Sequence, residues 1–319
     1  MKILVIKSSS MGDIIHALPV ASDIAEHVPG ACVDWVVEES FRDIPTFSPY
    51  VSSAVVTAFR RWRKHPFSSE TRAEVARLKD RLRSGRYDIV LDIQGLARTG
   101  LVVHWAGAPR AAGFSFSTVR EKPAALFYTP SLRFALDEDM GAVSRYRALA
   151  GLALGYKPEG LPRFGLRATR PNPVSVGSPY AALAVNTSRD SKLWPEDRWV
   201  RLMEDLKGMG LRSVLFWWSD SEKARVERLA SRTDAAVVAP RMGYADIAAV
   251  LAGAEIVVGA DTGIAHMGAA LGRPTVGIYV QSNPERTPIV GDAEHVSLGG
   301  FGRDTQESEV LDCCRRFLK

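Results

Sequence analysis

The sequence has little cysteine and no long apolar run. Only three cysteines occur among 319 residues. Cys313 and Cys314 are neighbours and Cys32 stands alone, which argues against a disulfide framework and favours a reducing compartment. No segment approaches the roughly 18 apolar residues of a membrane span, and the short apolar run Ile3 to Ile6 is not a signal-peptide pattern. We therefore expect a soluble, cytoplasmic protein.

Several catalytic motifs are also missing. Neither the phosphate-binding pattern G-x-x-x-x-G-K-S/T nor the dinucleotide pattern G-x-G-x-x-G occurs, which argues against ATP-driven phosphoryl transfer and hydride transfer. The six histidines lie too far apart for a zinc site, and no cluster of carboxylates indicates a required metal. We expect neither a cofactor nor an obligatory metal.

The positive charge is confined to one half of the chain. The net charge is +5, and residues 1–165 hold 22 Lys and Arg against 17 Asp and Glu, whereas residues 166–319 hold 19 of each. The first half is therefore the part expected to meet an anionic partner. A pI near 9.1 also leaves open a non-catalytic protein that binds anionic polymers such as nucleic acid. That alternative predicts basic and aromatic residues over a broad face, whereas here they concentrate in one short stretch.

Strands alternate with helices along the chain, which predicts parallel sheets covered by helices. The alternation lapses at LPRFGLRATRPNPVSVGSP, a stretch rich in Pro and Gly that marks the best boundary. We predict an α/β protein of two doubly wound domains, residues 1–165 and 180–319, joined by a linker at 166–179 and facing each other across a cleft. Expected strands are 2–6, 32–37, 53–57, 87–92, 180–185, 211–217, 235–239, 255–259 and 275–280; expected helices are 14–26, 71–84, 196–207, 222–231, 244–252 and 264–271.

The first polar cluster follows the first strand. The segment KSSSMGD is more polar than a strand-to-helix connection needs, and in doubly wound sheets ligands bind beyond the carboxyl ends of strands. Asp13 is a candidate functional carboxylate beside Ser10 and Gly12. It is also a candidate helix cap, because Ser10 and Asp13 have the spacing of a capping box.

A basic stretch, FRRWRKH, lies in the first half. Four cations in five positions normally form a solvated face, but arginine also suits bidentate contacts with phosphate or carboxylate. We predict that this stretch binds an anionic acceptor. The predicted acceptor-binding residues are Ser10, Gly12, Arg60, Arg61, Arg63, Lys64, Gln94, Arg98 and Arg120.

Three clusters in the second half follow predicted strands. Thr187, Ser188 and Lys192 offer hydroxyls and a cation that suit phosphate, although a plain polar loop has the same composition. Glu222 is either the carboxylate of an S-x-x-E capping box or an acceptor for ribose hydroxyls. In GADTGIAHMG, Gly263 lets a ligand approach the backbone at a helix start. A capping Asp261 and a buried His266 are the structural alternative there.

Taken together, these stretches resemble the ADP-heptose:lipopolysaccharide heptosyltransferases, glycosyltransferase family 9, of the heptosyltransferase I type. The resemblance covers nearly the whole chain. Its carriers are KSSSMGDIIHALP, VDWVVEE, RRWRK, DIQGL, TVREKP, SKLWPEDRW and GADTGIAHMGAALGRP; of these, RRWRK and TVREKP favour type I over type II. The segment 281–302 matches little, and Trp218-Ser219 stands where a Trp-Gly-like turn is expected.

The resemblance implies a GT-B fold and an inverting transfer that needs no metal, with the donor in the second domain and the acceptor in the first. It implies Asp13 as catalytic base. The implied donor-binding residues are Thr187, Ser188, Lys192, Glu222, Met242, Asp261, Thr262, Gly263 and His266, with Lys192 and Thr187 on the diphosphate, Glu222 on the ribose and Met242 on the adenine.

The implied reaction moves L-glycero-D-manno-heptose from ADP-heptose to a Kdo residue of Kdo2-lipid A. The enzyme would then work as a peripheral protein on the cytoplasmic leaflet of the inner membrane, held by charge, and would not bind nucleic acid. Heptosyltransferase II, or another transferase of the family with a different acceptor, is the nearest alternative. The basic first half favours type I, since Kdo and lipid A are more anionic than a heptose.

Overall fold

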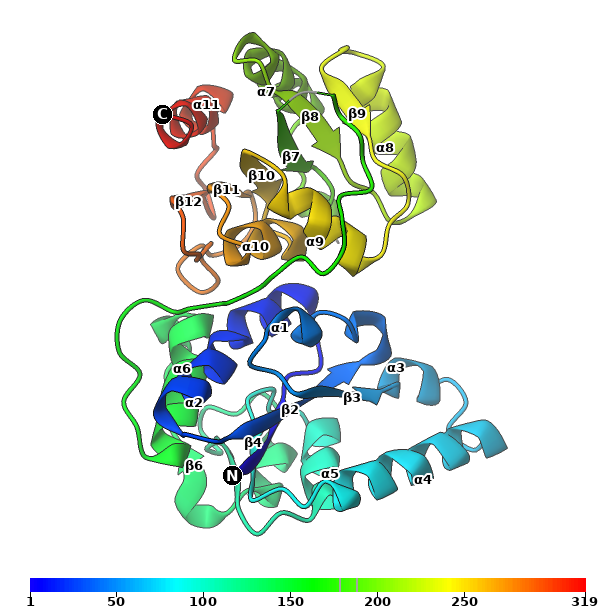
Figure 1. The fold of residues 1–319 in the computed structure, drawn as a ribbon, viewed down its shortest axis with the longest axis vertical. Helices are drawn as coiled ribbons and strands as arrows, with labels where there is room; N and C mark the ends of the chain where they lie inside the picture. The colour runs from blue at the N-terminus through cyan, green and yellow to red at the C-terminus, as the bar shows by residue number, and fades with distance from the viewer. Residues whose placement is uncertain (178, 188) are drawn as a thin grey trace. The chain divides into compact units, whose positions relative to one another are not determined.

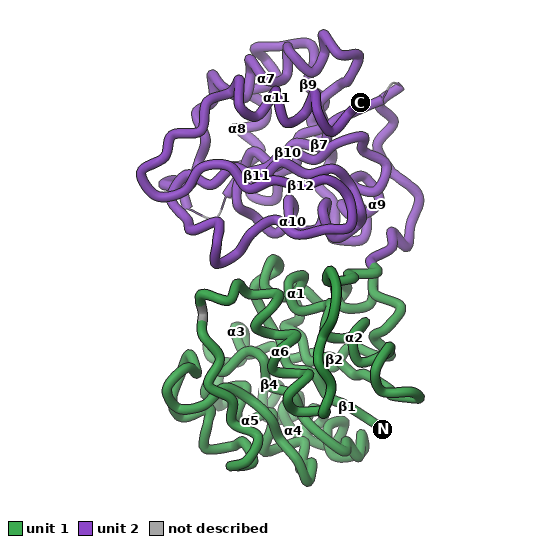
Figure 2. The backbone as a smooth tube through the Cα atoms, turned by 90° about the vertical axis from the view of Figure 1, so that its left-hand side faces the viewer, with its two compact units in different colours: residues 1–165 green, residues 166–319 purple. Residues whose placement is uncertain are grey.

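The computed structural model describes residues 1–177, 179–187 and 189–319, and the chain forms two compact units, Met1–Gly165 and Leu166–Lys319 (Figure 2). Each unit is built on one six-stranded parallel sheet. The inner strands of each sheet are buried on both faces, which is why these strands read as continuous apolar runs. No helix in the described ranges is long and apolar enough to cross a membrane.

The first unit, drawn from blue to green in Figure 1, has the strand order β3-β2-β1-β4-β5-β6. Its strands are β1 Lys2–Ile6, β2 Cys32–Glu38, β3 Ser53–Thr57, β4 Ile89–Asp92, β5 Ala111–Phe114 and β6 Arg133–Phe134. Its α-helices are α1 Met11–Ala17, α2 Pro19–His27, α3 Phe59–Trp62, α4 Ser69–Ser84, α5 Ala97–Ala106 and α6 Ala142–Leu154. Helix α6 packs on α1 and α2, and α4 packs on α5.

The second unit repeats the same order, β9-β8-β7-β10-β11-β12. Its strands are β7 Tyr180–Ala184, β8 Arg212–Leu215, β9 Ala236–Val238, β10 Ile256–Ala260, β11 Thr275–Tyr279 and β12 His295–Gly299. Its α-helices are α7 Glu196–Gly208, α8 Asp220–Ala230, α9 Tyr244–Ala252, α10 Gly263–Ala270 and α11 Glu307–Phe317. Helices α7 and α11 pack together beside a core that includes Trp194 and Trp199.

The prediction of doubly wound parallel sheets is confirmed, but three details were wrong or missing. The predicted helix 14–26 is two helices, because Pro19 has no N–H to continue the first and instead begins the second. The alternation after residue 92 was overlooked, and with it α5, β5 and α6. Strand β12 and helix α11 were overlooked as well.

The strand order fixes where ligands can bind. In each sheet the chain adds strands first toward one edge and then toward the other. The switch point lies between the two central strands, β1 and β4 in the first unit and β7 and β10 in the second. In open parallel sheets the loops at the carboxyl ends of these strands splay apart and form the binding crevice. The loops are residues 7–10 and 93–96 in the first unit, and 185–189 and 261–262 in the second. Most of the predicted site residues lie in or beside them.

Candidate active site

The first unit contains a cavity of about 1020 Å³ at the switch point between β1 and β4. Its polar wall includes Asp13, and a carboxylate beside a basic cavity matches the predicted acceptor site. The other predicted acceptor residues that line it are Ser10, Arg60, Arg63, Lys64, Gln94, Arg98 and Arg120. Gly12 lies within α1 and is not part of the lining.

An aromatic wall, which the sequence analysis missed, completes this cavity. Phe59, Trp62 and Trp105 line it, and the rings of Phe59 and Trp105 stack with centroids 6.4 Å apart. Aromatic faces beside cations suit a ligand with both apolar and charged surfaces. Phe59 and Trp62 belong to the basic stretch FRRWRKH, whereas Trp105 lies on α5, which the sequence pattern did not indicate.

Asp13 is held by the loop before α1. Its Oδ2 accepts hydrogen bonds from the backbone N–H of Ser10 at 3.0 Å and from the Ser10 hydroxyl at 2.8 Å. Its Oδ1 lies 3.7 Å from the ammonium of Lys7, and the carboxylate is about one-third exposed, at 34%. Burial alone would raise the pKa of Asp13, but the charge of Lys7 and the Ser10 hydrogen bonds lower it below its ordinary value. The carboxylate is therefore ionised and ready to accept a proton at neutral pH.

A second loop fixes the backbone of the first. The amide oxygen of Gln94 accepts hydrogen bonds from the N–H groups of Ser8 and Ser9, at 3.1 and 3.3 Å. Gln94 is in turn positioned by Asp92, whose Oδ1 accepts the N–H of Gln94 at 3.0 Å. Gln94 thus lines the cavity, as predicted, and also holds the loop that carries Ser10.

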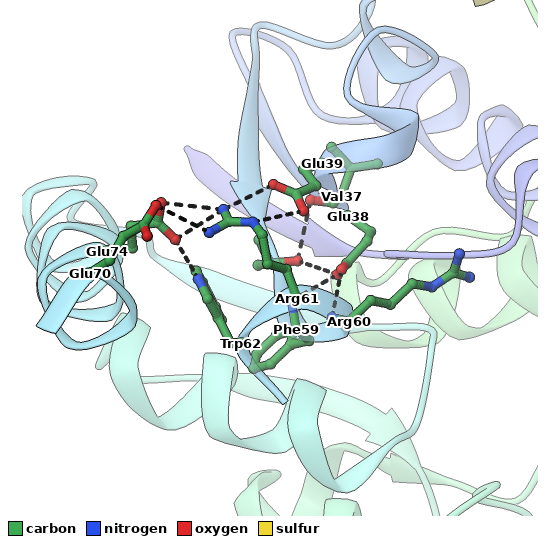
Figure 3. A network of polar contacts seen from close by, with 10 residues as sticks. Val37, Glu38, Glu39, Phe59, Arg60, Arg61, Trp62, Glu70 and Glu74 are labelled. Carbon is green, nitrogen blue, oxygen red and sulfur yellow. Dashed lines mark hydrogen bonds and ion pairs between the residues drawn. The ribbon is translucent and has the colours of Figure 1, made fainter. Parts of the chain in front are cut away.

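Arg61 is separated from its basic neighbours (Figure 3). The prediction grouped it with Arg60 on the acceptor. Its guanidinium instead bonds Glu39 through Nε at 3.2 Å and Nη2 at 3.0 Å, and it also pairs with Glu74 at 3.0 Å. Trp62 donates to the same Glu74 at 2.5 Å. Arg61 lines a different, smaller cavity of about 400 Å³, so its role is to fix the basic segment rather than to face the acceptor.

Helix α3 begins on a carboxylate from β2. Glu38 accepts hydrogen bonds from the backbone N–H groups of Phe59 at 3.2 Å and Arg60 at 2.9 Å, and from the Thr57 hydroxyl at 3.1 Å (Figure 3). A carboxylate at a helix start satisfies donors that would otherwise be unpaired. Glu38 and Glu39, both within the VDWVVEE motif, thereby anchor the basic segment.

In the second unit, Lys192 and Asp261 meet at the switch point between β7 and β10. The Lys192 ammonium lies 2.7 Å from Asp261 Oδ2, and His266 Nε2 lies 3.3 Å from Oδ1. Burial would raise the pKa of Asp261, but His266 and Lys192 together bring it well below its usual range. The predicted diphosphate cation is thus held in place by a carboxylate.

Two buried oxygens at this switch point lack hydrogen-bond partners among the described residues. They are Thr262 Oγ1, at the start of α10, and Asn186 Oδ1, at the end of β7. A buried polar atom without a partner is costly unless a ligand or water satisfies it. The prediction that Thr262 and Gly263 contact the donor gains support from this geometry.

The remaining predicted donor residues are placed as follows. Glu222 forms the capping box, accepting from the N–H groups of Trp218 at 2.6 Å and Ser219 at 3.1 Å. Its ribose role stays a prediction. Thr187 donates to the carbonyl of Arg189 at 2.6 Å. Met242 is buried, and Ser188 lies outside the described residues.

One further aromatic pair joins Trp218 to Tyr244, which follows Met242 by two residues. Trp218 and Tyr244 stack nearly parallel, with centroids 5.8 Å apart, and Arg241 lies over the Trp218 ring at 5.5 Å. The next residue, Ser219, is where the sequence departs from the expected Trp-Gly-like turn. Within the described ranges, no group of three or more His, Cys, Asp or Glu is placed to hold a metal ion.

A family model described as Glycosyltransferase family 9 (heptosyltransferase) matches residues 75–311. The chain belongs to this glycosyltransferase family. Lipopolysaccharide heptosyltransferase 1 of Pseudomonas aeruginosa is 38% identical over 300 residues, 94% of this chain and 84% of that protein. The enzyme of the same name from Salmonella typhimurium is 36% identical over 316 residues, which are 98% of this chain and 94% of that protein.

The fold agrees with these relatives. The structure of E. coli heptosyltransferase WaaC with ADP-2-deoxy-2-fluoro heptose superimposes with a TM-score of 0.86 at 33% identity, covering 100% of this chain and 99% of that one. Lipopolysaccharide heptosyltransferase 2 of Escherichia coli is 24% identical over 316 residues. The GT-B architecture and the glycosyltransferase activity class, both predicted from sequence, are confirmed.

The ion pair in the second unit gives a first prediction. Replacing Lys192 by alanine would remove the predicted charge-assisted contact to the diphosphate, together with the cation that pairs with Asp261. We expect ADP binding, measured by calorimetry on the full chain, to weaken by about 1.5–3 kcal/mol. Lys223→Ala, on the surface of α8, is the matched control and should bind ADP normally. Unchanged ADP affinity in Lys192→Ala would remove this residue from the site.

Proposed function

We propose that this glycosyltransferase transfers L-glycero-D-manno-heptose from ADP-heptose to a Kdo residue of Kdo2-lipid A, the first heptose of the lipopolysaccharide core. The observation that carries the proposal is the acceptor-side cavity, in which the ionised carboxylate of Asp13 lies among cations. The relatives named lipopolysaccharide heptosyltransferase 1 from Pseudomonas, Salmonella and Escherichia are 36–38% identical over nearly the whole chain, whereas the one from Campylobacter coli is 21% identical. Those named heptosyltransferase 2 are 24–25% identical.

The acceptor hydroxyl loses its proton to Asp13 as its oxygen attacks the anomeric carbon. A correctly placed general base increases the reaction rate by about 10²–10⁴-fold. The bond from that carbon to the diphosphate oxygen breaks on the opposite side, so the configuration inverts. Arg60, Arg63 and Lys64 hold the acceptor's carboxylates and phosphates in the cavity, and the aromatic wall covers its sugar rings.

The donor lies in the second unit in this proposal. Lys192 meets the diphosphate, and the Thr262 hydroxyl and the first amides of α10 stabilise the negative charge that builds on the departing ADP. Glu222 contacts the ribose and Met242 the adenine. None of these roles needs a metal, and we propose a metal-independent reaction.

The acceptor is anchored in a lipid bilayer, so we propose that the enzyme works as a peripheral protein on the cytoplasmic leaflet. Arg60, Arg63 and Lys64 are exposed along one segment. Each basic residue near an anionic surface contributes about 1 kcal/mol. This charge term is enough for reversible attachment without a spanning helix.

The proposed reaction is tested by incubating the protein with ADP-heptose and deacylated Kdo2-lipid A and measuring ADP release. We expect ADP release that depends on this acceptor, with a product heavier by one heptose. The matched acceptor is the same molecule already carrying one heptose, which is the kind of acceptor a type II enzyme uses. Faster transfer to that second acceptor would favour the type II alternative, and no transfer to either would refute the proposal.

The basic segment gives a third prediction. Replacing Arg60, Arg63 and Lys64 together by alanine should raise the acceptor KM about tenfold or more and weaken binding to anionic liposomes, since charge attracts both. ADP affinity should stay unchanged. Arg61→Ala is the contrasting variant: it breaks the contacts to Glu39 and Glu74, and we expect a lower melting temperature of the first unit. A loss of ADP affinity with normal acceptor kinetics in the triple variant would show that the segment is misassigned.

A further inference from the structure

A buried lysine stands behind Asp13. Lys7 follows β1, and its side chain is only 4% exposed. Its ammonium donates to the Tyr146 hydroxyl at 2.7 Å and lies 4.4 Å from the centre of that ring. Burying an ammonium is costly unless partners replace its water. Burial alone would lower the pKa of Lys7, but Tyr146 and Asp13 raise it above its ordinary value, so the group carries its charge at neutral pH.

The two oxygens of Asp13 are used differently. Both hydrogen bonds that the carboxylate accepts from described residues end on Oδ2, and both come from Ser10. Oδ1 faces the Lys7 ammonium at 3.7 Å, which is too long for a hydrogen bond. Lys7 therefore acts on Oδ1 as a charge and does not occupy its lone pairs. Oδ1 is the atom that can take a proton from an acceptor in the cavity.

The position of the ammonium is set from another helix. Tyr146 lies on α6, 139 residues along the chain from Lys7, and it is itself buried. Without its hydroxyl, the ammonium would lose the hydrogen-bond partner that the described residues give it, and the carboxylate oxygen Asp13 Oδ1 lies 3.7 Å away. The ammonium would then close the 3.7 Å gap to a direct hydrogen bond, which would lower the basicity of Asp13 and block the atom that must accept the proton.

We propose that Tyr146 is a positioning residue of the transfer reaction: by accepting the hydrogen bond of Lys7, it keeps the ammonium at a distance from Asp13 and leaves Oδ1 open to the acceptor hydroxyl. The proposal rests on the function proposed above. In the step itself, the acceptor O–H bond breaks and its proton goes to Oδ1. The oxygen bonds to the anomeric carbon, and the electron pair of the broken glycosidic bond leaves with ADP.

Further charged groups lie on α1, at the end of β4, on the helices packed against α1, and in the lining of the cavity. On α1 itself, His16 lowers the pKa of Asp13, and at the end of β4 the carboxylate of Asp92 acts on Lys7. On the helices packed against α1, Arg147 of α6 is paired with Asp23 of α2 at 2.7 Å, and Arg145 lies over the ring of Phe114. The charged groups that line the cavity with Asp13 are Arg60, Arg63, Lys64, Arg98, Arg120 and Glu121.

The direct test is the pKa of Asp13, measured by NMR on full-length protein with ¹³C-labelled aspartate carboxyls. The signal is assigned by its loss in Asp13→Asn. In Tyr146→Phe we expect the pKa to fall by about half a unit to one unit, because the ammonium moves closer. In Lys7→Met we expect it to rise above the wild-type value. In Lys7→Met the further change Tyr146→Phe should have no effect, since Tyr146 acts only through Lys7.

Kinetics supply the second readout. In Tyr146→Phe, kcat should fall about tenfold, the acidic limb of the pH profile should move to lower pH with the pKa of Asp13, and the KM for ADP-heptose should stay unchanged. Tyr87→Phe is the matched control, because it removes a similar buried bond to Asp34, at 2.8 Å, in the same unit. It should leave both the pKa of Asp13 and kcat as in the wild type.

An unchanged or higher pKa of Asp13 in Tyr146→Phe would overturn the proposal, whatever the activity. If Tyr146→Phe does not fold, Lys7→Met provides the test. An unchanged pKa of Asp13 in Lys7→Met would overturn the proposal, because it would show that the Lys7 ammonium does not influence Asp13. The expected pKa shifts in a protein that transfers no heptose would uphold the positioning role and refute the proposed function, so the two failures are distinguishable.

Discussion

The buried carboxylate of Asp92 organises the acceptor side of this enzyme. It ends β4 without exposure to solvent, and its two oxygens accept from the N–H groups of Gln94 and Gly95 and from the hydroxyls of Thr99 and Tyr128, at 2.8–3.0 Å. Burial raises its pKa in spite of these bonds. Four donors from one loop, one helix and one distant tyrosine are thereby fixed around a single group, which is how a loop becomes rigid enough to position others.

The loop after β4 in turn fixes the loop after β1. Gln94 binds the backbone of Ser8 and Ser9, the loop presents Ser10 to Asp13, and Lys7 at its start carries the charge that keeps Asp13 ionised. In the second unit, different side chains lie at the switch point of the sheet. There Lys192 and Asp261 pair across the switch point, so that a carboxylate holds a cation in place. In the proposed reaction, proton transfer and charge stabilisation would take place at equivalent ends of two similar sheets.

The ends of the central strands and the polar residues after them were predictable from sequence, because they depend on residues that are neighbours in the chain. The buried runs Ile3 to Ile6 and Ile256 to Ala260 mark their strands, and polar residues directly after them mark the switch points. Contacts between distant segments were not predictable. Nothing in the sequence separates Arg61 from Arg60, because the separation depends on Glu39 and Glu74 from other elements. Tyr146 carries no motif either, and only the packing of α6 on α1 brings it to Lys7.

In the proposed reaction Asp13 accepts the acceptor's proton, and Asp13→Asn tests this role most directly. Asparagine retains the size of the side chain and an oxygen for the Ser10 hydrogen bonds, and it caps a helix nearly as well as aspartate. Steady-state kinetics should therefore be compared with a thermal melt and with ADP calorimetry. We expect turnover to be lower by about 10²-fold or more, with unchanged melting and ADP binding. Turnover at the wild-type rate would contradict this role.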